Sequence, residues 1–311
     1  MNQLTLYTPV SSFFSSRFNG RKVQKLPVNA GFTCPVRDGK LSKSGCAFCN
    51  GKSFVPSYCI QGDNIATQLH KGRDFFARKF NADAQPVYLA YFQSATNTYA
   101  SVSDLNAFYR QAINLDFIQG VVVSTRPDCI DSSIVDLLSL LQRETFVMVE
   151  LGCESFSDRV LTSLGRGHNV SQLCSAVGLL QASFIPVSLH LILGLPGEAP
   201  DYVVKTAHAL NELNVDAVKL HQLQIVKGSA YARLYAHNPL SFKLYTPETY
   251  VSDVCDILEN LQPSLAIDRF VSETPSVDLI APKWGLKPDL IKHSVINELQ
   301  RRKTYQGFCL Q

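Results

Sequence analysis

Short apolar runs alternate with segments of helical periodicity from residue 87 to residue 223 of this 311-residue chain. Positions such as Leu173, Ala176, Val177 and Leu180 recur every three or four residues, as on the buried face of a helix. The predicted strands between such segments are residues 87–92, 120–124, 146–151, 186–193 and 215–223. Strands that are apolar throughout are typical of a parallel sheet buried on both faces, so the pattern predicts an α/β fold.

An extended segment at residues 23–30 brings the predicted β/α units to about six. Both an open doubly wound sheet and a partial barrel satisfy this pattern, and periodicity does not choose between them. Beyond residue 235 the alternation weakens, leaving a helix around 250–261, a further possible strand at 265–271 and a final helix at 288–303. We therefore divide the chain into an N-terminal segment (1–22), a core (23–235) and an α/β extension packed on that core (236–311).

A loop rich in Gly, Ser, Lys and Pro follows the first segment and carries three of the nine cysteines. Cys34, Cys46 and Cys49 have the spacing C-x11-C-x2-C, and no fourth ligand stands at a matched spacing. Three thiolates holding a four-iron cluster leave one iron open to bind a second molecule. Structural zinc, with Cys59 or His70 as the fourth ligand, fits the spacing equally well.

Composition narrows the class of protein without naming an activity. Hydrophobic residues make up 46% and charged residues 18%, which is ordinary for a globular protein, and the formal charge of +3 does not argue for nucleic acid. Residues 1–20 do not resemble a signal peptide, and no stretch approaches the roughly 20 apolar residues of a membrane span. Nine cysteines in a chain of this length fit free thiols in a reducing compartment. We expect a cytoplasmic protein with neither membrane nor DNA as a partner.

Polar and glycine-rich residues recur at the ends of the predicted strands. They are found at residues 93–99, 124–128, 150–155, 190–198 and 219–222. In parallel α/β proteins ligands bind at the carboxyl ends of the strands, so these segments predict one shared cleft.

Several of these residues also have a purely structural interpretation. Arg126 and Asp128 can pair with each other at the surface, and Gly194 can serve only the turn into the next helix. His190 on a strand is more often a core histidine than a base. Glu150 differs, because a carboxylate on an apolar strand requires a partner or a ligand.

The motifs together resemble those of radical S-adenosylmethionine (SAM) proteins of the YhcC/YtqA-like branch, related to the catalytic subunit of Elongator. The matching stretches span nearly the whole chain in the family's order: 25–50, 90–100, 124–128, 149–154, 166–168, 190–198, 219–221, 226–229 and 304–307. The resemblance implies a partial (β/α)6 barrel of the TIM type in which Cys34, Cys46 and Cys49 ligate a 4Fe–4S cluster. It further implies an open iron that takes SAM, and a reduced cluster that cleaves SAM to a 5′-deoxyadenosyl radical, which abstracts hydrogen from a substrate.

The same resemblance implies roles for residues at the strand ends. Gln93 and Ser94 match the contacts to the methionine moiety of SAM. The contacts to the ribose and the carboxylate correspond to Ser124, Arg126 and Glu150. The segment along the adenine corresponds to Ile192, Leu193 and Gly194.

The chain departs from the family's pattern in two places, the cysteine loop and the segment expected near the substrate. The cysteine spacing is longer than the common C-x3-C-x2-C, and residues 268–274 lack the His and Gly-Asp-Gly residues expected of close relatives. The relation to Elongator implies an RNA nucleoside as a possible substrate, and the basic residues of 287–303 are a weak indication of RNA binding. The resemblance also implies an external electron donor such as a flavodoxin or ferredoxin. The competing hypothesis is a non-catalytic binding protein whose loop is ordered by zinc or a cluster.

Overall fold

The computed structural model describes residues 5–41, 45–51, 55–60, 62–81 and 85–310. Its main sheet has seven parallel strands in the order β1-β2-β3-β4-β5-β6-β8. Their bounds are β1 Val23–Val28, β2 Val87–Phe92, β3 Ile118–Thr125, β4 Phe146–Glu154, β5 Val187–Leu193, β6 Ala217–Gln222 and β8 Ala266–Arg269. A separate antiparallel pair consists of β7 (Ile225–Val226) and β9 (Leu279–Ala281).

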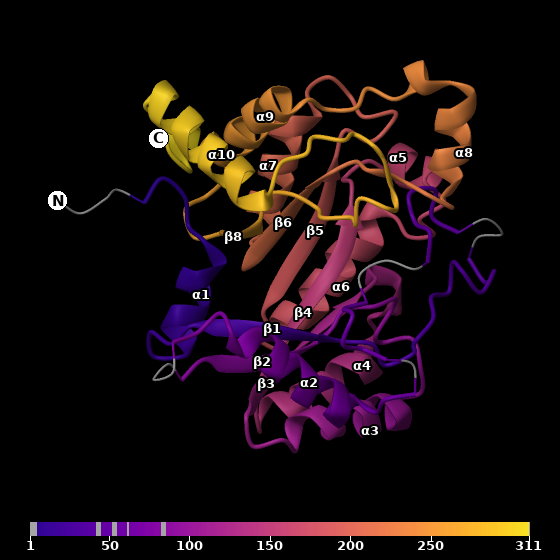
Figure 1. Cartoon of the computed structure of the whole chain (residues 1–311), viewed down its shortest axis with the longest axis vertical. Helices are drawn as coiled ribbons and strands as arrows, with labels where there is room; N and C mark the ends of the chain where they lie inside the picture. Colours follow the sequence, from indigo (N-terminus) through magenta and orange to yellow (C-terminus); the bar gives the residue numbers. More distant parts are fainter. Residues whose placement is uncertain (1–4, 42–44, 52–54, 61, 82–84, 311) are drawn as a thin grey trace.

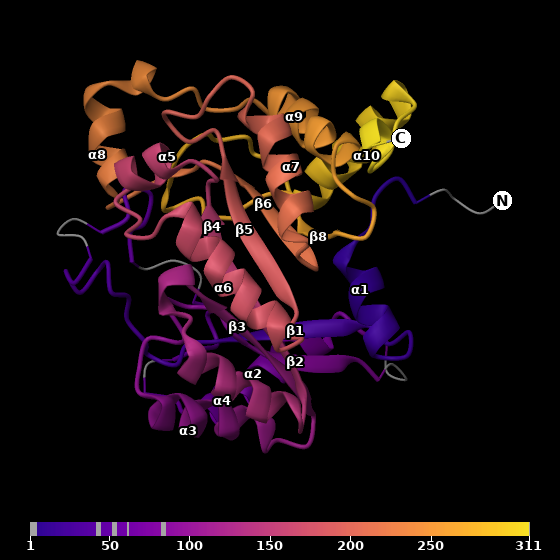
Figure 2. The same ribbon diagram turned by 180° about the vertical axis from the view of Figure 1, so that it is seen from behind.

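Helices follow most strands and cover the outer side of the curled sheet (Figures 1 and 2). They are α1 Val10–Arg17, α2 Ile65–Ala77, α3 Val102–Ile113, α4 Ser132–Gln142, α5 Asp158–Ser163, α6 Val170–Ala182, α7 Tyr202–Leu213, α8 Ala230–His237, α9 Pro247–Glu259 and α10 Pro288–Arg302. Short 3-10 turns occur at Pro127–Cys129, Pro239–Ser241 and Phe308–Leu310. Ser101, Asp131 and Asn169 cap three of the helices through their side-chain oxygens, which stabilises each start by about 1 kcal/mol. In the described part of the chain, no helix combines the length and apolar character that a bilayer crossing requires.

The sheet curls far enough to bring its two edge strands together. Lys25 on β1 and Asp268 on β8 form an ion pair, with Nζ and Oδ2 2.6 Å apart, although 243 positions separate them in the sequence. Helix α1 packs beside both edges, and Pro9 just before it bridges to Ile267 of β8. The sheet is therefore a half-barrel whose open side is closed by α1 and an ion pair.

Side chains that point into the half-barrel form successive layers along the strands. The layer nearest the amino ends of the strands is apolar and packs around Phe14 of α1, which is 4% exposed. Its strand members are Val87, Leu89, Val122, Met148, Ala217 and Ala266. The outward residues of the same strands pack against the helices in the main hydrophobic core, which explains why most strands are apolar throughout.

The predicted α/β partial barrel is confirmed, with one strand more than the six units expected. The seventh strand, β8, comes from the extension and pairs with β6 in parallel. Short helices α1, α5 and α8 were not predicted, and the boundary placed at residue 235 falls inside α8. That the extension packs on the core as one unit stays a prediction.

Candidate active site

A layer of charged side chains lies above the apolar layer inside the half-barrel. Glu150 of β4 is fully buried, with Oε1 2.7 Å from Lys25 Nζ and Oε2 2.6 Å from Lys219 Nζ. The Tyr91 hydroxyl donates to Glu150 Oε2 at 2.5 Å, and Asp268 bonds Lys25. Two ammonium groups thus face two carboxylates, and the layer is balanced in charge.

The neighbouring cations keep these buried carboxylates ionised. Burial raises the pKa of Glu150, but Lys219, Lys25 and the hydrogen bond from His190 outweigh it and hold that pKa well below its usual range. Burial likewise raises the pKa of Asp268, and the attraction of Lys25 and Lys219 lowers it to about 2. The carboxylates are therefore charged at neutral pH.

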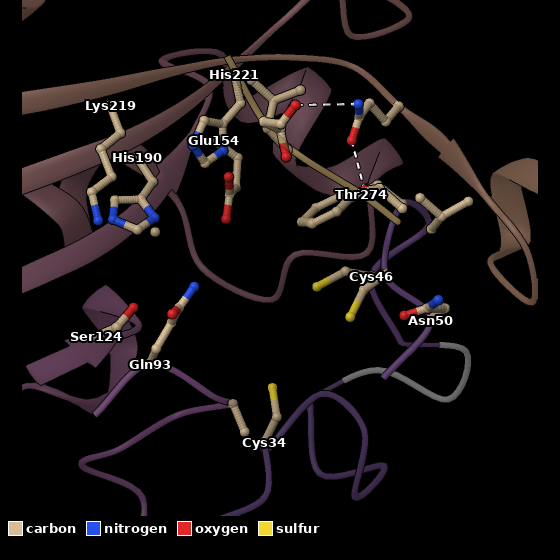
Figure 3. Close-up of a pocket in the computed structure, with 18 of the residues that line it drawn as sticks. Cys34, Cys46, Asn50, Gln93, Ser124, Glu154, His190, Lys219, His221 and Thr274 are labelled. Atoms are coloured by element: carbon tan, nitrogen blue, oxygen red, sulfur yellow. Dashed lines mark hydrogen bonds between the residues drawn. The ribbon is translucent and has the colours of Figure 1, made fainter. Parts of the chain in front are cut away.

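Above the ionic layer, at the carboxyl ends of the strands, lies a cavity of about 570 Å³. Its volume falls within the range of about 300–1,000 Å³ found for small-molecule sites. Figure 3 shows Gln93 and Ser124 pointing into it from one side, His190, Lys219 and His221 from another, and Cys34 and Cys46 from the loop opposite. The predicted shared cleft therefore exists, and the cysteine loop forms one of its walls.

Backbone hydrogen bonds hold the two-cysteine turn against the barrel. The Cys49 N–H donates to Cys46 O at 3.0 Å, which closes the turn. The Ala47 N–H donates to Leu164 O at 2.8 Å, and the Tyr231 N–H donates to Ala47 O at 2.9 Å. Two core segments, the end of α5 and the start of α8, thereby fix the direction of this pair of thiols.

Hydrogen-bond donors and cations surround the three sulfur atoms. Arg37 Nη2 lies 3.6 Å and the Gly51 N–H 3.4 Å from Cys49 Sγ, while Arg166 Nη1 lies 3.7 Å from Cys46 Sγ. Positive groups and N–H donors stabilise thiolates, the form in which cysteine ligates a metal.

The thiol of Cys34 is itself shifted toward the thiolate. Burial raises its pKa, but hydrogen bonds from Thr96 and the Val36 backbone, with the charge of Arg126, bring the net pKa below its ordinary value. All nine cysteines are free, and Cys34 and Cys46 are buried at the cavity wall. The donor set fits a cluster bound by three thiolates.

Arg126 lines the cavity and has one guanidinium nitrogen without a partner among the described residues. Its Nη2 donates to Arg166 O at 2.5 Å and pairs with Asp128 Oδ1 at 2.9 Å, while Nη1 is buried and makes no hydrogen bond. An unpaired buried donor on a cavity wall is stabilised by a ligand oxygen. Behind it, burial and the two arginines lower the pKa of His168 to about 3, so this ring stays neutral.

Glu154 is a cavity residue that the predicted site did not include. It ends β4 with φ at +67°, a left-handed conformation that is rare outside glycine and is found often at functional sites. Arg166 Nη2 lies 3.2 Å from Glu154 Oε1 and donates to Gly152 O at 2.8 Å. A Cβ on Gly152 would lie 2.4 Å from that guanidinium, so the arrangement requires glycine there.

The structure brings some of the predicted SAM contacts to the cavity and leaves others outside its wall. Those that line it are Gln93, Ser124, Arg126 and Ile192. Those outside the lining set are Ser94, Glu150, Leu193 and Gly194. Glu150 was predicted at a strand end, but β4 continues to Glu154. Glu150 therefore lies deeper in the half-barrel, below the cavity.

Gly194 is covered by aromatic side chains from outside the predicted adenine segment. A Cβ there would lie 2.9 Å from the ring of Tyr245, and its N–H donates to the Tyr202 hydroxyl at 3.1 Å. The segment 192–194 therefore reaches the cavity through Ile192.

The alternative fourth ligands for zinc lie elsewhere. Cys59 contacts Pro27 O with its sulfur at 3.6 Å, and the His70 ring packs on Phe117. Among the described residues, no group of three or more His, Cys, Asp or Glu is placed around a single ion site. A cluster does not require such a group, since each thiolate binds a different iron.

Comparisons with known proteins agree with this geometry. The sequence matches the Radical SAM superfamily over residues 43–210 and the Radical_SAM C-terminal domain over residues 215–301. It is 33% identical to uncharacterized protein YtqA of Bacillus subtilis, covering 94% of this chain and 89% of that protein. It is 35% identical to protein YhcC of Escherichia coli, covering 86% and 84%.

More distant matches share part of the chain or the fold. A tRNA uridine(34) acetyltransferase of Dehalococcoides mccartyi is 26% identical over 55% of this chain and 36% of its own length. The structure of Elp3 from Methanocaldococcus infernus superposes with a TM-score of 0.71 at 15% identity, covering 92% of this chain and 64% of that one. The chain therefore belongs to the radical SAM superfamily, whose enzymes use a 4Fe–4S cluster and SAM, and within it to the family of YtqA and YhcC.

Proposed function

We propose that this protein carries out radical chemistry in the cavity at the strand ends, on a substrate held beside SAM. The observation that carries the proposal is the placement of Cys34, Cys46 and Cys49 on one wall of a cavity whose other walls are strand ends. When bound and reduced, the cluster supplies one electron to SAM, whose cleavage gives a 5′-deoxyadenosyl radical able to abstract hydrogen from a substrate.

The residues of the chain would hold and orient the two cofactors. Cys34, Cys46 and Cys49 ligate the cluster, and Arg37 and Arg166 stabilise its thiolates. We assign Arg126, whose Nη1 has no described partner, to a carboxylate, and Gln93, Ser124, Glu154 and Ile192, which line the cavity, to the rest of SAM. Fixed polar groups around a sulfonium align the bond that breaks. That Ser94, Glu150, Leu193 and Gly194 contribute stays a prediction from the resemblance.

The reaction requires a source of electrons and a reducing location. We propose a flavodoxin or ferredoxin as the external donor and the cytoplasm as the compartment. The nine free cysteines are consistent with that compartment.

Anaerobic reconstitution tests the proposal. The protein is loaded with iron and sulfide, reduced, and given SAM, and 5′-deoxyadenosine is measured by chromatography and mass spectrometry. We expect cluster absorbance and 5′-deoxyadenosine in the wild type, and neither in Cys46→Ala. A wild type that forms the cluster and binds SAM but never releases 5′-deoxyadenosine would refute it, and tightly bound zinc without iron would favour the binding-protein hypothesis.

An RNA nucleoside is the first substrate to test. The argument for it is the partial match to a tRNA uridine(34) acetyltransferase. Of the basic residues in 287–303, Arg301 and Arg302 pair with Glu298, and Arg302 also pairs with Asp256 and Glu259. Lys287, Lys292 and Lys303 are exposed and form no ion pair with any described residue, so they are the candidates for phosphate contact.

Binding of tRNA at several salt concentrations decides this point. Three phosphate contacts would give a slope of log K against log[salt] of roughly −2 to −3. We expect the triple variant Lys287→Gln/Lys292→Gln/Lys303→Gln to flatten that slope, with 5′-deoxyadenosine release rising when tRNA is added to the wild type. No salt-dependent binding would remove RNA as the substrate and leave a small molecule.

A further inference from the structure

Arg269 is a cation on the cavity wall with no partner among the described residues. It lies at the end of β8, in register with Lys219 of β6, and its side chain is exposed to the cavity. The other four described cations on this wall each have a partner: Cys49 for Arg37, Asp128 for Arg126, Glu154 for Arg166 and Glu150 for Lys219. Arg269 is therefore the cation of this wall that has no partner among the described residues.

The groups beneath Arg269 do not neutralise it. Lys25 and Lys219 are matched by Glu150 and Asp268, so the ionic layer is already balanced. Two acidic residues on the following loop, Glu273 and Asp278, also line the cavity, but neither forms an ion pair with Arg269. Within the described structure, the Arg269 guanidinium is therefore unpaired and open to a ligand.

His221 supplies a second unsatisfied group at the same end of the cavity. Its Nε2 is buried and has no hydrogen-bond partner, and its ring lies 5.8 Å from that of His190. Burial, with the charges of Arg269 and Lys219 nearby, holds the pKa of His221 well below its usual range, so the ring is neutral. A neutral imidazole accepts or donates one hydrogen bond at each nitrogen and does not compete with Arg269 for an anion.

The wall around Arg269 is built rigidly. Ser272, three residues later, donates its N–H to Gln222 Oε1 at 3.0 Å, and the Thr274 hydroxyl donates to Gln224 Oε1 at 2.7 Å. Gln222 at the end of β6 and Gln224 just after it thus fix the loop that continues from β8. The backbone on both sides of Arg269 is held by the sheet and by this loop.

The end of β8 that carries Arg269 pairs with β6 at Lys219, and Lys219 lies across the cavity from the cluster ligands. In Figure 3 Lys219 and the neighbouring His190 point in from the side opposite Cys34 and Cys46. An anion bound there is therefore separate from the SAM carboxylate expected beside the cysteines. We propose that Arg269, near the ring of His221, binds a carboxylate or phosphate group of the substrate, so that the substrate is an oxyanion. This inference rests on the proposed function, because it takes the cavity to hold a substrate beside SAM.

Binding of simple oxyanions to the full chain tests the inference. Phosphate and acetate are titrated separately by calorimetry, with chloride keeping the ionic strength constant, into protein with and without its cluster. Arg269→Gln removes the charge and Arg269→Lys keeps it. Arg143→Gln is the matched control, since Arg143 is exposed, ends α4 before the amino end of β4, and forms no ion pair with a described residue. Melting curves without ligand check that each variant is folded.

We expect the wild type and Arg143→Gln to bind at least one of the two anions equally well. Loss of a charge-assisted hydrogen bond at Arg269→Gln weakens that binding about tenfold or more, and Arg269→Lys retains part of it. The preferred anion identifies the substrate group as phosphate or carboxylate. No binding above the chloride background in the wild type, or equal binding by Arg269→Gln, would overturn the inference.

Neither cluster nor SAM is needed for this measurement. A protein that binds the oxyanion but releases no 5′-deoxyadenosine refutes the proposed chemistry and leaves the anion site standing. A protein that cleaves SAM but binds no oxyanion supports the proposed chemistry and refutes the anion site.

Discussion

Replacing Glu150 with glutamine separates two roles that its position allows. The resemblance assigns Glu150 to SAM, whereas the structure buries it completely between Lys25 and Lys219. Glu150→Gln keeps the shape of the side chain and removes its charge, which leaves two buried ammonium groups facing Asp268 alone. The structural role predicts a loss of stability, and the ligand role predicts a loss of SAM affinity.

The size of the stability loss follows from the burial of the pair. Breaking a buried ion pair by removing one partner costs about 3–5 kcal/mol, because the other charge stays buried without compensation. Stabilities of native domains are about 5–15 kcal/mol, so this loss is a large fraction of the total. For a chain of this size we expect a melting temperature lower by roughly 10 °C.

Calorimetric melting of the cluster-free, reduced protein measures this effect. The control is Glu144→Gln, which breaks the exposed ion pair with Arg110 and is expected to leave the melting temperature unchanged. The double variant Glu150→Gln/Lys219→Met removes one charge of each sign, and its loss is expected to be smaller than the sum of the two single losses. Unchanged stability in Glu150→Gln together with weakened SAM binding would refute the structural role.

The same network sets a pH dependence with a defined sign. The pKa values of Glu150 and Asp268 are lowered in the folded state, that of Asp268 to about 2. The stability they contribute is therefore fully present above their unfolded pKa values of about 4 and is lost as the pH falls through the folded values. As the pH is lowered below about 4, the melting temperature of Glu150→Gln is expected to fall less steeply than that of the wild type.

Three further substitutions test other parts of the fold and the site. Cys46→Ala is expected to abolish cluster absorbance after anaerobic reconstitution, whereas Cys59→Ala, outside the cavity, retains it; equal loss in both would contradict the assigned ligands. Gly152→Ala places a methyl group 2.4 Å from the buried guanidinium of Arg166 and is expected to weaken SAM binding in equilibrium dialysis. Its control, Gly178→Ala, lies in a helix with no described neighbour within 4 Å of the added methyl group and is expected to raise stability by up to about 1 kcal/mol. Phe14→Ala leaves a cavity in the apolar layer and is expected to lower the free energy of unfolding, measured in urea, by about 3–5 kcal/mol. A loss below about 1 kcal/mol would show that α1 does not close the half-barrel.

The sequence predicts the strands well because burial on both faces makes them apolar throughout. The runs at 87–92, 146–151 and 186–193 each fall on a strand of the sheet, with ends shifted by at most a few residues. Helix α1 escapes prediction because its eight residues include four serines and only Phe14 is fully buried. Neither the curl of the sheet nor the pairing of its edges is encoded locally, since both depend on contacts between the two ends of the chain.

The end of β4 was predicted too early, for a physical reason. The apolar run of β4 ends at Leu151, which was taken as the end of the strand. Inward residues alternate with outward ones, so Met148, Glu150 and Gly152 point into the half-barrel in succession. Counting that alternation onward would have placed Glu150 in the interior and drawn attention to Glu154 at the end of β4.

The ion pair between Lys25 and Asp268 also bears on whether the core and the C-terminal extension are separate domains. Asp268 and the whole of β8 come from the extension, and β8 pairs with β6 along one edge of the sheet. Removing residues 238–311 would leave two buried lysines facing Glu150 alone and expose an unpaired edge, which invites aggregation. We therefore propose that core and extension fold as one unit, and we expect the chain truncated after His237 to be insoluble or to melt without a cooperative transition. A truncated chain that melts cooperatively would show that the extension is dispensable for folding and that the ionic layer tolerates an uncompensated charge.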